Sequence, residues 1–146
     1  LALFLTSLNI RVKLFSDDHG PSGDFDCLLV DTMGHLAGLY QVCDVAFIGG
    51  SMVLQGGHNP LEAAVFGKPI LFGPDMSDFL SVSRMLMEGQ GALQVADETQ
   101  LTHELVFLFE NPRVRQERGR RNYELISRHA GAVMKIVRTL EAMQIV

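Results

Sequence analysis

The chain has 146 residues, of which 47% are hydrophobic and 20% are charged, and its formal net charge at pH 7 is -5. This composition is typical of a globular domain with a single buried core, so we expect residues 1–146 to form one domain. The acidic balance excludes a surface that attracts nucleic acid or an anionic membrane as a whole, and no apolar run reaches the roughly 18 residues of a membrane span. Any phosphate partner must therefore be held at a local site.

Cysteine and acidic residues give no sign of a metal site. Cys27 and Cys43 lack metal-ligand spacing and are too few for a disulfide framework, which predicts free apolar thiols in a reducing compartment. The cluster Asp17, Asp18 and His19 is interpreted as loop polarity. The chain also begins without a methionine, directly in amphipathic sequence, which we interpret as a piece of a longer protein.

Predicted strands and helices alternate along the chain. A helix end at residues 1–8 comes first, and a polar, turn-rich loop is expected at residues 16–26. Short apolar runs predict buried strands, and amphipathic stretches predict helices. The predicted strands are residues 11–15, 27–30, 45–50, 69–73 and 92–95. The predicted helices are residues 33–43, 60–66, 77–88, 97–110 with an Asp97 cap, and two more between residues 112 and 146, divided near Ala130 and Gly131.

This alternation predicts an α/β fold with a Rossmann-like, doubly wound parallel sheet, because parallel neighbours need helical crossovers. Such sheets bind ligands beyond the carboxyl ends of their strands. Residues 31–34 and 49–59 both follow predicted strands and are therefore placed at that end.

A glycine-rich loop follows the strand at residues 45–50. Gly49, Gly50, Gly56 and Gly57 would let backbone amides approach a phosphate, and the start of the next helix would add its positive dipole end. A flexible connection with tight turns accounts for these glycines equally well. Neither the G-x-G-x-x-G fingerprint nor a P-loop sequence is present, so the loop by itself defines no ligand class.

The sequence at the start of the next helix can be explained either by helix capping or by ligand binding. Asn59 at the N-cap, Pro60 at the first helical position and Glu62 two residues later match a capping box, which helix chemistry alone explains. The functional alternative is that Glu62 faces the crevice and accepts hydrogen bonds from a ribose diol.

Five further residues are weak candidates for ligand contact when each is considered alone. His58 has the chemistry to donate to an anion and Ser51 to bond a phosphate oxygen, although bonding to nearby backbone is the commoner role of each. Met33 and Gly34 are expected to open a helix directly after a strand, which makes their amides available to a phosphate. His35 lies in that same turn and, alone, is a solvated surface residue.

Basic residues are scattered and give no nucleic-acid signature. Lys68 and Arg84 are interpreted as exposed charges, although a basic group near the crevice would suit an anionic ligand. The stretch at residues 113–121 contains Glu117 and lacks aromatic partners, so we interpret it as a solvated helix face.

Two stretches together resemble a known family. DTMGHLAGLYQVCDVAFIGGS and GGHNPLEAAVFGKPILFGP are similar to the C-terminal, donor-binding half of bacterial 3-deoxy-D-manno-octulosonic acid (Kdo) transferases, which are GT-B glycosyltransferases. The resemblance implies the C-terminal half of a GT-B fold and the donor CMP-Kdo, with the Met33 and Gly34 amides near the cytidylate phosphate and Glu62, followed by the sequence Gly-Lys-Pro, near the ribose. The donor-site residues that it implies are Met33, Gly34, His35, Gly49, Gly50, Ser51, Gly56, Gly57, His58, Asn59 and Glu62.

The chain departs from the family pattern at two places within the matching region. His35 replaces a glutamate, and residues 75–79 read DMSDF where the family has H-x-F-N-F, so that only Phe79 carries over. The family's N-terminal domain and an Arg-His-Pro stretch have no counterpart in these residues.

The missing domain shapes what the resemblance implies for function. That domain carries the membrane-associating segment, the acceptor site for the lipid A precursor and the general base of an inverting transfer at the cytoplasmic face of the inner membrane. This chain is therefore expected to be a soluble donor-binding piece of lipopolysaccharide biosynthesis that has no catalytic residue, metal or cofactor of its own. Two alternatives remain open: another GT-B enzyme, such as a UDP-sugar transferase or an epimerase, and a non-catalytic nucleotide-binding module.

Overall fold

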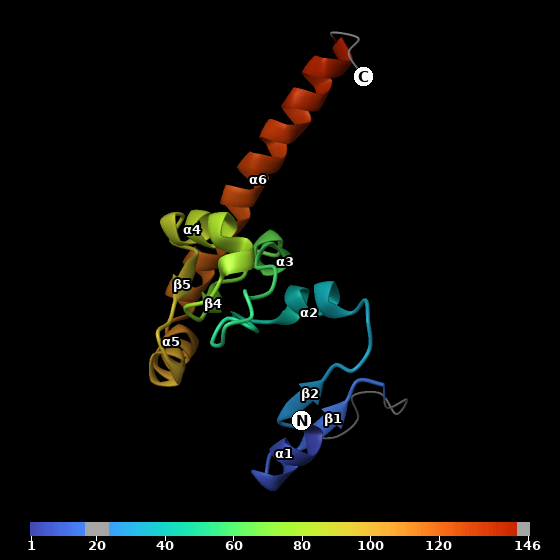
Figure 1. The fold of residues 1–146 in the computed structure, drawn as a ribbon, viewed down its shortest axis with the longest axis vertical. Coiled ribbons are helices and arrows are strands. Elements are labelled where there is room, and N and C mark those ends of the chain that lie inside the picture. Colours follow the sequence, from blue (N-terminus) through green and yellow to red (C-terminus); the bar gives the residue numbers. More distant parts are fainter. Residues whose placement is uncertain (17–23, 143–146) are drawn as a thin grey trace. The chain divides into compact units, whose positions relative to one another are not determined.

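The computed structural model describes residues 1–16 and 24–142 (Figure 1). The predicted polar cluster Asp17, Asp18 and His19, and most of the predicted loop around it, lie outside the described residues. The chain divides into two compact units, Leu1–Leu39 and Tyr40–Val146.

The first unit contains a short parallel sheet and one helix. The helix α1 (Ala2–Ser7) comes before β1 (Val12–Leu14), which pairs in parallel with β2 (Cys27–Leu29). At the amino ends of the two strands, Nε and Nη2 of Arg11 donate to the carboxylate of Asp26 at 2.9 and 2.8 Å. The Arg11 hydrogen bond lowers the pKa of Asp26 to about 2. This ion pair helps to set the register of the two strands.

The helix α2 (Leu36–Val42) is shorter than the predicted helix at residues 33–43, so the prediction is wrong at its amino end. Gly34 has a φ of 89°, which lies in the left-handed region and cannot continue into a right-handed helix. The helix begins only after this turn, and the backbone carbonyl of His35 accepts the bond from the amide of Leu39 at 3.2 Å. Met33 and Gly34 therefore precede the helix instead of forming its first turn.

The second unit is built around a three-stranded parallel sheet in the order β3-β4-β5. The strands are β3 (Ala46–Ile48), β4 (Ile70–Phe72) and β5 (Ala92–Gln94). Every residue of the central strand β4 is at most 1% exposed. Burial on both faces is the pattern expected of a parallel strand covered by helices on either side.

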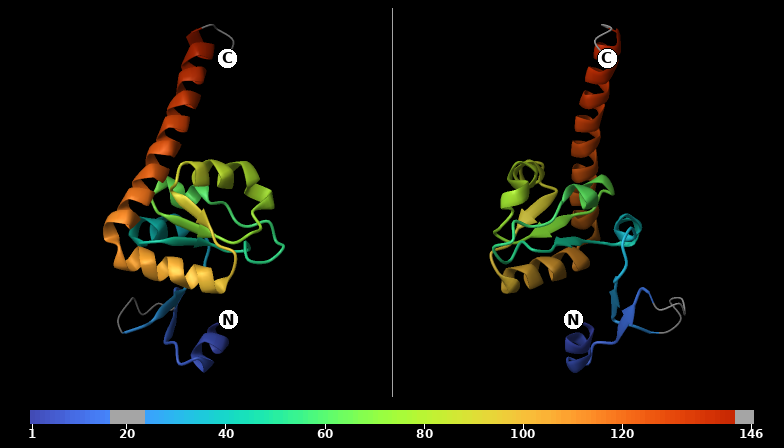
Figure 2. Two further views of the ribbon diagram at one scale, coloured as in Figure 1. Left: turned by 90° about the vertical axis from the view of Figure 1, so that its left-hand side faces the viewer. Right: turned by 45° about the vertical axis from the view of Figure 1, so that its right-hand side comes forward.

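Helices cover both faces of this sheet, as the doubly wound prediction requires. The helices that follow the strands are α3 (Leu61–Val65), α4 (Leu80–Glu88), with the short 3-10 turn η1 (Ser77–Phe79) before it, and α5 (Glu98–Glu110). The helices α4 and α5 lie on opposite sides of the sheet (Figure 2). The predicted α/β class with parallel strands is confirmed, although the described strands pair as two sheets, one in each unit, and not as a single continuous sheet.

The helix α5 begins where the sequence predicts. The side chain of Asp97 accepts a hydrogen bond from the amide of Gln100 at 2.8 Å, and the side chain of Gln100 accepts one from the amide of Ala96 at 2.8 Å. These two bonds satisfy backbone donors that the helix itself leaves unpaired. The predicted Asp97 cap is confirmed.

The last helix, α6 (Pro112–Ala142), is continuous, so the prediction of two helices divided near Ala130 and Gly131 is wrong. A glycine inside a helix costs only about 1 kcal/mol relative to alanine, and it ends a helix only when the chain turns into a left-handed cap. No proline follows Gly131 to enforce such a turn. In the part of the chain that the structure describes, neither α6 nor any other helix is long and apolar enough to cross a membrane.

Close backbone packing holds α6 against the turn after α3. A Cβ atom added to Gly119 would lie 2.0 Å from the carbonyl oxygen of Gly67. The buried side chain of Asn122 donates from Nδ2 to the carbonyl oxygens of Lys68 and Gly91 at 2.8 and 2.9 Å. The Gly67-Lys68-Pro69 stretch of the motif therefore has a structural role, because it is the place where α6 docks.

Arginines on α6 divide into two groups. Arg115 and Arg118 are only 20% and 24% exposed, and they pair with Asp44 at 3.1 Å and with Glu104 at 3.6 Å. The prediction of a solvated basic face is therefore wrong for these two residues, which dock the helix.

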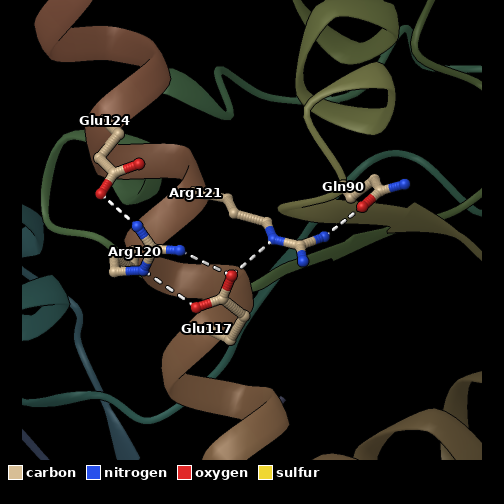
Figure 3. A network of polar contacts seen from close by, with 5 residues as sticks. All are labelled: Gln90, Glu117, Arg120, Arg121 and Glu124. Carbon is tan, nitrogen blue, oxygen red and sulfur yellow. Dashed lines mark hydrogen bonds and ion pairs between the residues drawn. The ribbon is translucent and has the colours of Figure 1, made fainter.

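The prediction holds for the exposed network shown in Figure 3. There Glu117 bonds Arg120 and Arg121, while Glu124 also bonds Arg120. The hydrogen bond from Arg120, followed by that from Arg121, lowers the pKa of Glu117 to about 2. Arg121 also donates to Gln90 in the turn between α4 and β5, so this network adds a polar contact between α6 and that turn (Figure 3).

Candidate functional site

Ser51 joins the loops that follow β3 and β4. The side chain is buried, and its hydroxyl donates to the carbonyl oxygen of Ile48 at 2.5 Å and accepts from the amide of Gly73 at 2.8 Å. The carbonyl oxygen of Ser51 accepts from the amide of Asp75 at 2.9 Å. A buried hydroxyl with these partners is unavailable to a phosphate. Ser51 therefore has the structural role of bonding nearby backbone.

Three amides of the glycine loop already have acceptors inside the protein. The amide of Gly56 donates to Oδ2 of Asp75 at 2.8 Å. The amides of Gly57 and His58 donate to the carbonyl oxygens of Gly50 and Gly49 at 3.3 and 3.1 Å. The expectation that the second glycine pair offers free amides to a phosphate is therefore not met in this conformation.

The space beside the second glycine pair is also filled by the protein. A Cβ atom added to Gly56 would lie 2.4 Å from Cγ of Asp78, and one added to Gly57 would lie 2.5 Å from Sδ of Met76. Both glycines have a positive φ, 77° and 72°. Glycine is favoured at both positions because the loop after β4 packs directly on this backbone and because the φ is positive.

Asp75 holds the loop after β4 against the glycine loop. Its carboxylate accepts from the amide of Gly56 at 2.8 Å and from the amide of Ser77 at 3.2 Å. The Gly56 hydrogen bond is the main reason that the pKa of Asp75 lies below its usual range. Sequence reasoning noticed residues 75–79 only as a departure from the family pattern. The adjacent Gly56 and Gly57 were the available sequence signal, because a residue without a Cβ allows a close protein neighbour as well as a ligand.

The capping prediction is half confirmed at the start of α3. Oδ1 of Asn59 accepts from the amide of Leu61 at 3.1 Å, and Pro60 already has helical angles (φ -78°, ψ -15°). Asn59 therefore caps the helix. The Glu62 half of the predicted box is not formed, because the Glu62 side chain is exposed and makes no hydrogen bond to any residue that the structure describes. Its carboxylate is free to accept hydrogen bonds from a ligand.

Among the expected donor-site residues of the second unit, Glu62 and His58 have exposed polar side chains. The His58 ring lies along the first glycine pair, since a Cβ atom added to Gly49 would be 3.4 Å from its Cδ2 and one added to Gly50 would be 3.7 Å from its Nε2. After burial, the negative charge of Glu62 is the next cause that raises the pKa of the half-buried Tyr40. The structure thus brings Gly49, Gly50 and His58 together, with Glu62 following on α3.

Met33, Gly34 and His35 lie in the first unit, after the carboxyl end of β2. Met33 is 95% exposed, and a Cβ atom added to Gly34 would meet nothing within 4 Å. The ring of His35, which stands where the family has a glutamate, lies 4.5 Å from the ring of Phe15. The backbone at residues 33 and 34 is open to a ligand, and His35 is exposed, as expected, although its ring contacts Phe15.

Asp31 organises this end of the first sheet. Its carboxylate accepts from the amide and the hydroxyl of Ser16 at 3.0 and 2.6 Å. The hydroxyl bond is the main cause that lowers the pKa of Asp31. Because Ser16 follows β1 and Asp31 follows β2, this contact ties together the carboxyl ends of both strands.

A pocket of about 180 Å³ lies at the carboxyl ends of β4 and β5. Sequence reasoning missed it, because its lining comes from two strands, the loop after β4 and one helix. The lining residues are Phe72, Pro74, Met76, Leu80, Ser83, Arg84, Met87 and Gln94. Within the described ranges, no group of three histidine, cysteine or acidic residues is placed to hold a metal ion.

Curated relatives of the chain are 3-deoxy-D-manno-octulosonic acid transferases. The chain is 35% identical to the enzyme of Haemophilus influenzae over 83% of this chain and 29% of the relative, and 32% identical to that of Bordetella pertussis over 85% and 28%. The transferase of Rickettsia felis is 35% identical over 70% and 22%. The chain therefore spans less than a third of the length of the curated relatives it matches. No protein-family model matches the chain.

A solved structure has the same fold. The crystal structure of the C-terminal CMP-Kdo binding domain of WaaA from Acinetobacter baumannii superimposes with a TM-score of 0.79 and is 23% identical. The match covers 85% of this chain and 65% of that domain. The predicted Rossmann-like fold, as in the C-terminal half of a GT-B enzyme, is confirmed. The chain is therefore a relative of the 3-deoxy-D-manno-octulosonic acid transferases, and the resemblance noted in its motifs is confirmed.

Proposed function

We propose that this chain is the donor-binding part of a transferase that moves Kdo from CMP-Kdo to a lipid A precursor. The observation that carries the proposal is the common fold with a crystallised CMP-Kdo binding domain over 85% of this chain. The sequence relation to curated Kdo transferases supports it. So does the position of the motif residues beyond the carboxyl ends of parallel strands, where such folds bind ligands.

Within the second unit, exposure and hydrogen bonding support some donor contacts over others. Glu62 has an exposed carboxylate that no described residue hydrogen-bonds, and it follows the loop between β3 and α3, so it is proposed to accept hydrogen bonds from the ribose hydroxyls. His58 and the exposed backbone of Gly49 are proposed to meet the phosphate side of the nucleotide. Ser51, Gly56, Gly57 and Asn59 act indirectly, because their polar groups or their shape hold the loop in place.

In the first unit, the backbone at Met33 and Gly34 is open, and we propose that it is available to a phosphate group. Hydrogen-bond donors beside a leaving phosphate stabilise the negative charge that develops on it. The attack itself is proposed to be inverting: a base outside this chain deprotonates a sugar hydroxyl of the lipid A precursor, and the oxygen then displaces CMP from the anomeric carbon. The proposal places the acceptor site and any membrane contact outside these residues as well.

Nucleotide-dependent thermal stabilisation tests the proposal. A ligand at 100 times its dissociation constant adds about 2.7 kcal/mol to the free energy of unfolding, which is a shift of several degrees in Tm for a chain of this size. We expect CMP to stabilise the chain more than UMP at equal concentration. A chain that is folded and responds equally to both nucleotides would favour another GT-B enzyme, and a chain that responds to neither would contradict donor binding.

A further inference from the structure

We propose that the pocket at the carboxyl ends of β4 and β5 receives the sugar-acid part of the donor, and that Arg84 pairs with its carboxylate. This inference rests on the proposed function and extends it from the nucleotide to the sugar. The pocket is bounded by the last residues of both strands, Phe72 and Gln94, and by Arg84 on α4. It therefore lies at the end of the sheet where α/β folds bind ligands.

Arg84 supplies the positive charge of this pocket. The side chain is exposed and makes no hydrogen bond or ion pair with any other residue in the described ranges. Arg115 and Arg118, in contrast, are mostly buried and already paired with carboxylates of the protein. A guanidinium group without a partner presents a fork of donors that matches a carboxylate in a bidentate geometry.

The remaining lining suits a sugar ring. Nε2 of Gln94 donates to the carbonyl oxygen of Pro74 at 3.1 Å, which leaves its Oε1 to accept from a sugar hydroxyl. Leu80, Met76 and Met87 provide apolar walls for the carbon face of the ring. One cation, one amide acceptor and apolar walls match an acidic sugar better than they match a second phosphate or a purely apolar ligand.

Size and position assign the pocket to one part of the donor. Pockets that enclose a whole small molecule have volumes of roughly 300–1,000 Å³, so a pocket of about 180 Å³ takes only part of a nucleotide sugar. Met76 lines the pocket and also packs on Gly57, because a Cβ atom added there would lie 2.5 Å from its Sδ. Met76 thus contacts both the pocket and the glycine loop, where the nucleotide is proposed to bind.

The test uses the two halves of the donor separately. Free Kdo, as its sodium salt, and CMP are each titrated into the wild-type chain and into Arg84→Gln and Arg84→Lys variants. Arg113→Gln is the matched control, because Arg113 is also exposed and unpaired within the described chain and lies on α6, outside the pocket lining. Methyl-labelled methionine reports the location by NMR, since two of the seven methionines, Met76 and Met87, line the pocket.

We expect Arg84→Gln to weaken Kdo binding about ten-fold or more, Arg84→Lys to weaken it less, and Arg113→Gln to leave it unchanged. The methyl signals of Met76 and Met87 should shift with Kdo, and CMP affinity should stay the same in all variants. Equal Kdo affinity in the wild type and in a folded Arg84→Gln chain, or Kdo shifts that spare both methionines, would overturn the inference. Failure of the wild type to bind CMP would instead contradict the proposed function, which the Kdo titration does not test.

Discussion

The glycine loop, residues 49–58, and the start of α3, residues 59–62, are adjacent in the motif but differ in how they use their polar groups. In the loop, the amides of Gly56 and Gly57 and the hydroxyl of Ser51 all bond to the protein itself. At the start of α3, Asn59 caps the helix, but Glu62 is exposed and has no such partner in the described chain. The motif therefore gives the position of the candidate site, and within it Glu62 is the residue proposed to contact the ligand.

Gly56→Ala should produce the largest loss of stability. The new methyl group would lie 2.4 Å from Cγ of Asp78, on a backbone with a φ of 77°. Strain at a positive φ and overpacking each cost about 1–3 kcal/mol, so we expect unfolding in urea to give a free energy lower by about 2–4 kcal/mol. Gly38→Ala is the control, because its methyl group would meet nothing within 4 Å and its φ is not in the left-handed region. An equal effect at both positions would show that the loop is not packed as described.

Ser51→Ala should have the next largest effect. It removes a buried hydroxyl and leaves the amide of Gly73 without its acceptor, which costs about 1–3 kcal/mol. Ser81→Ala, at an exposed position on α4, should change the free energy of unfolding by less than about 0.5 kcal/mol. If urea denaturation gives the same midpoint for both variants, the hydroxyl is not the link between the two loops.

Asn59→Ala tests the cap. Loss of an N-cap side chain costs about 1 kcal/mol, and we expect that decrease in thermal or urea unfolding. Glu62→Gln should change stability by less than about 0.5 kcal/mol, because its carboxylate makes no bond within the described residues. If Glu62→Gln lowers the free energy of unfolding as much as Asn59→Ala does, then Glu62 also caps the helix. The two side chains would then not differ in role.

The smallest effect is the pH dependence contributed by Asp75. Its pKa is lower in the folded state, chiefly through the Gly56 amide, so its contribution to stability is present above the unfolded pKa of about 4 and declines as the pH falls toward the folded value. We expect the wild type to be more stable than Asp75→Asn at pH 7, and the difference between them to shrink below about pH 4. A difference that is constant with pH would mean that the charge of Asp75 is not what fastens the loop.

Local signals in the sequence were sufficient for the strands, for most of the helices and for the Asp97 cap, because each depends on residues close together in the chain. The partners of the glycine loop were not accessible in this way. Asp75 lies 19 residues from Gly56, and Asn122 lies 54 residues from Lys68, whose carbonyl it binds. Neither periodicity nor spacing in the sequence indicates that two polar groups so far apart in the chain will form a hydrogen bond. The unbroken α6 was missed because Gly131 resembles a helix end in sequence, although no cap follows it.

Calorimetric titration of CMP into the wild type and into Glu62→Gln tests the central claim, that the carboxylate of Glu62 contacts the nucleotide, whereas the amides of Gly56 and Gly57 bond to the protein itself. Asn59→Ala is the matched control, because it perturbs the same helix start without removing the carboxylate. We predict that Glu62→Gln loses roughly ten-fold or more in CMP affinity at unchanged stability, since a hydrogen bond to a charged group contributes about 1.5–3 kcal/mol. Unchanged CMP affinity in a folded Glu62→Gln chain would contradict the account.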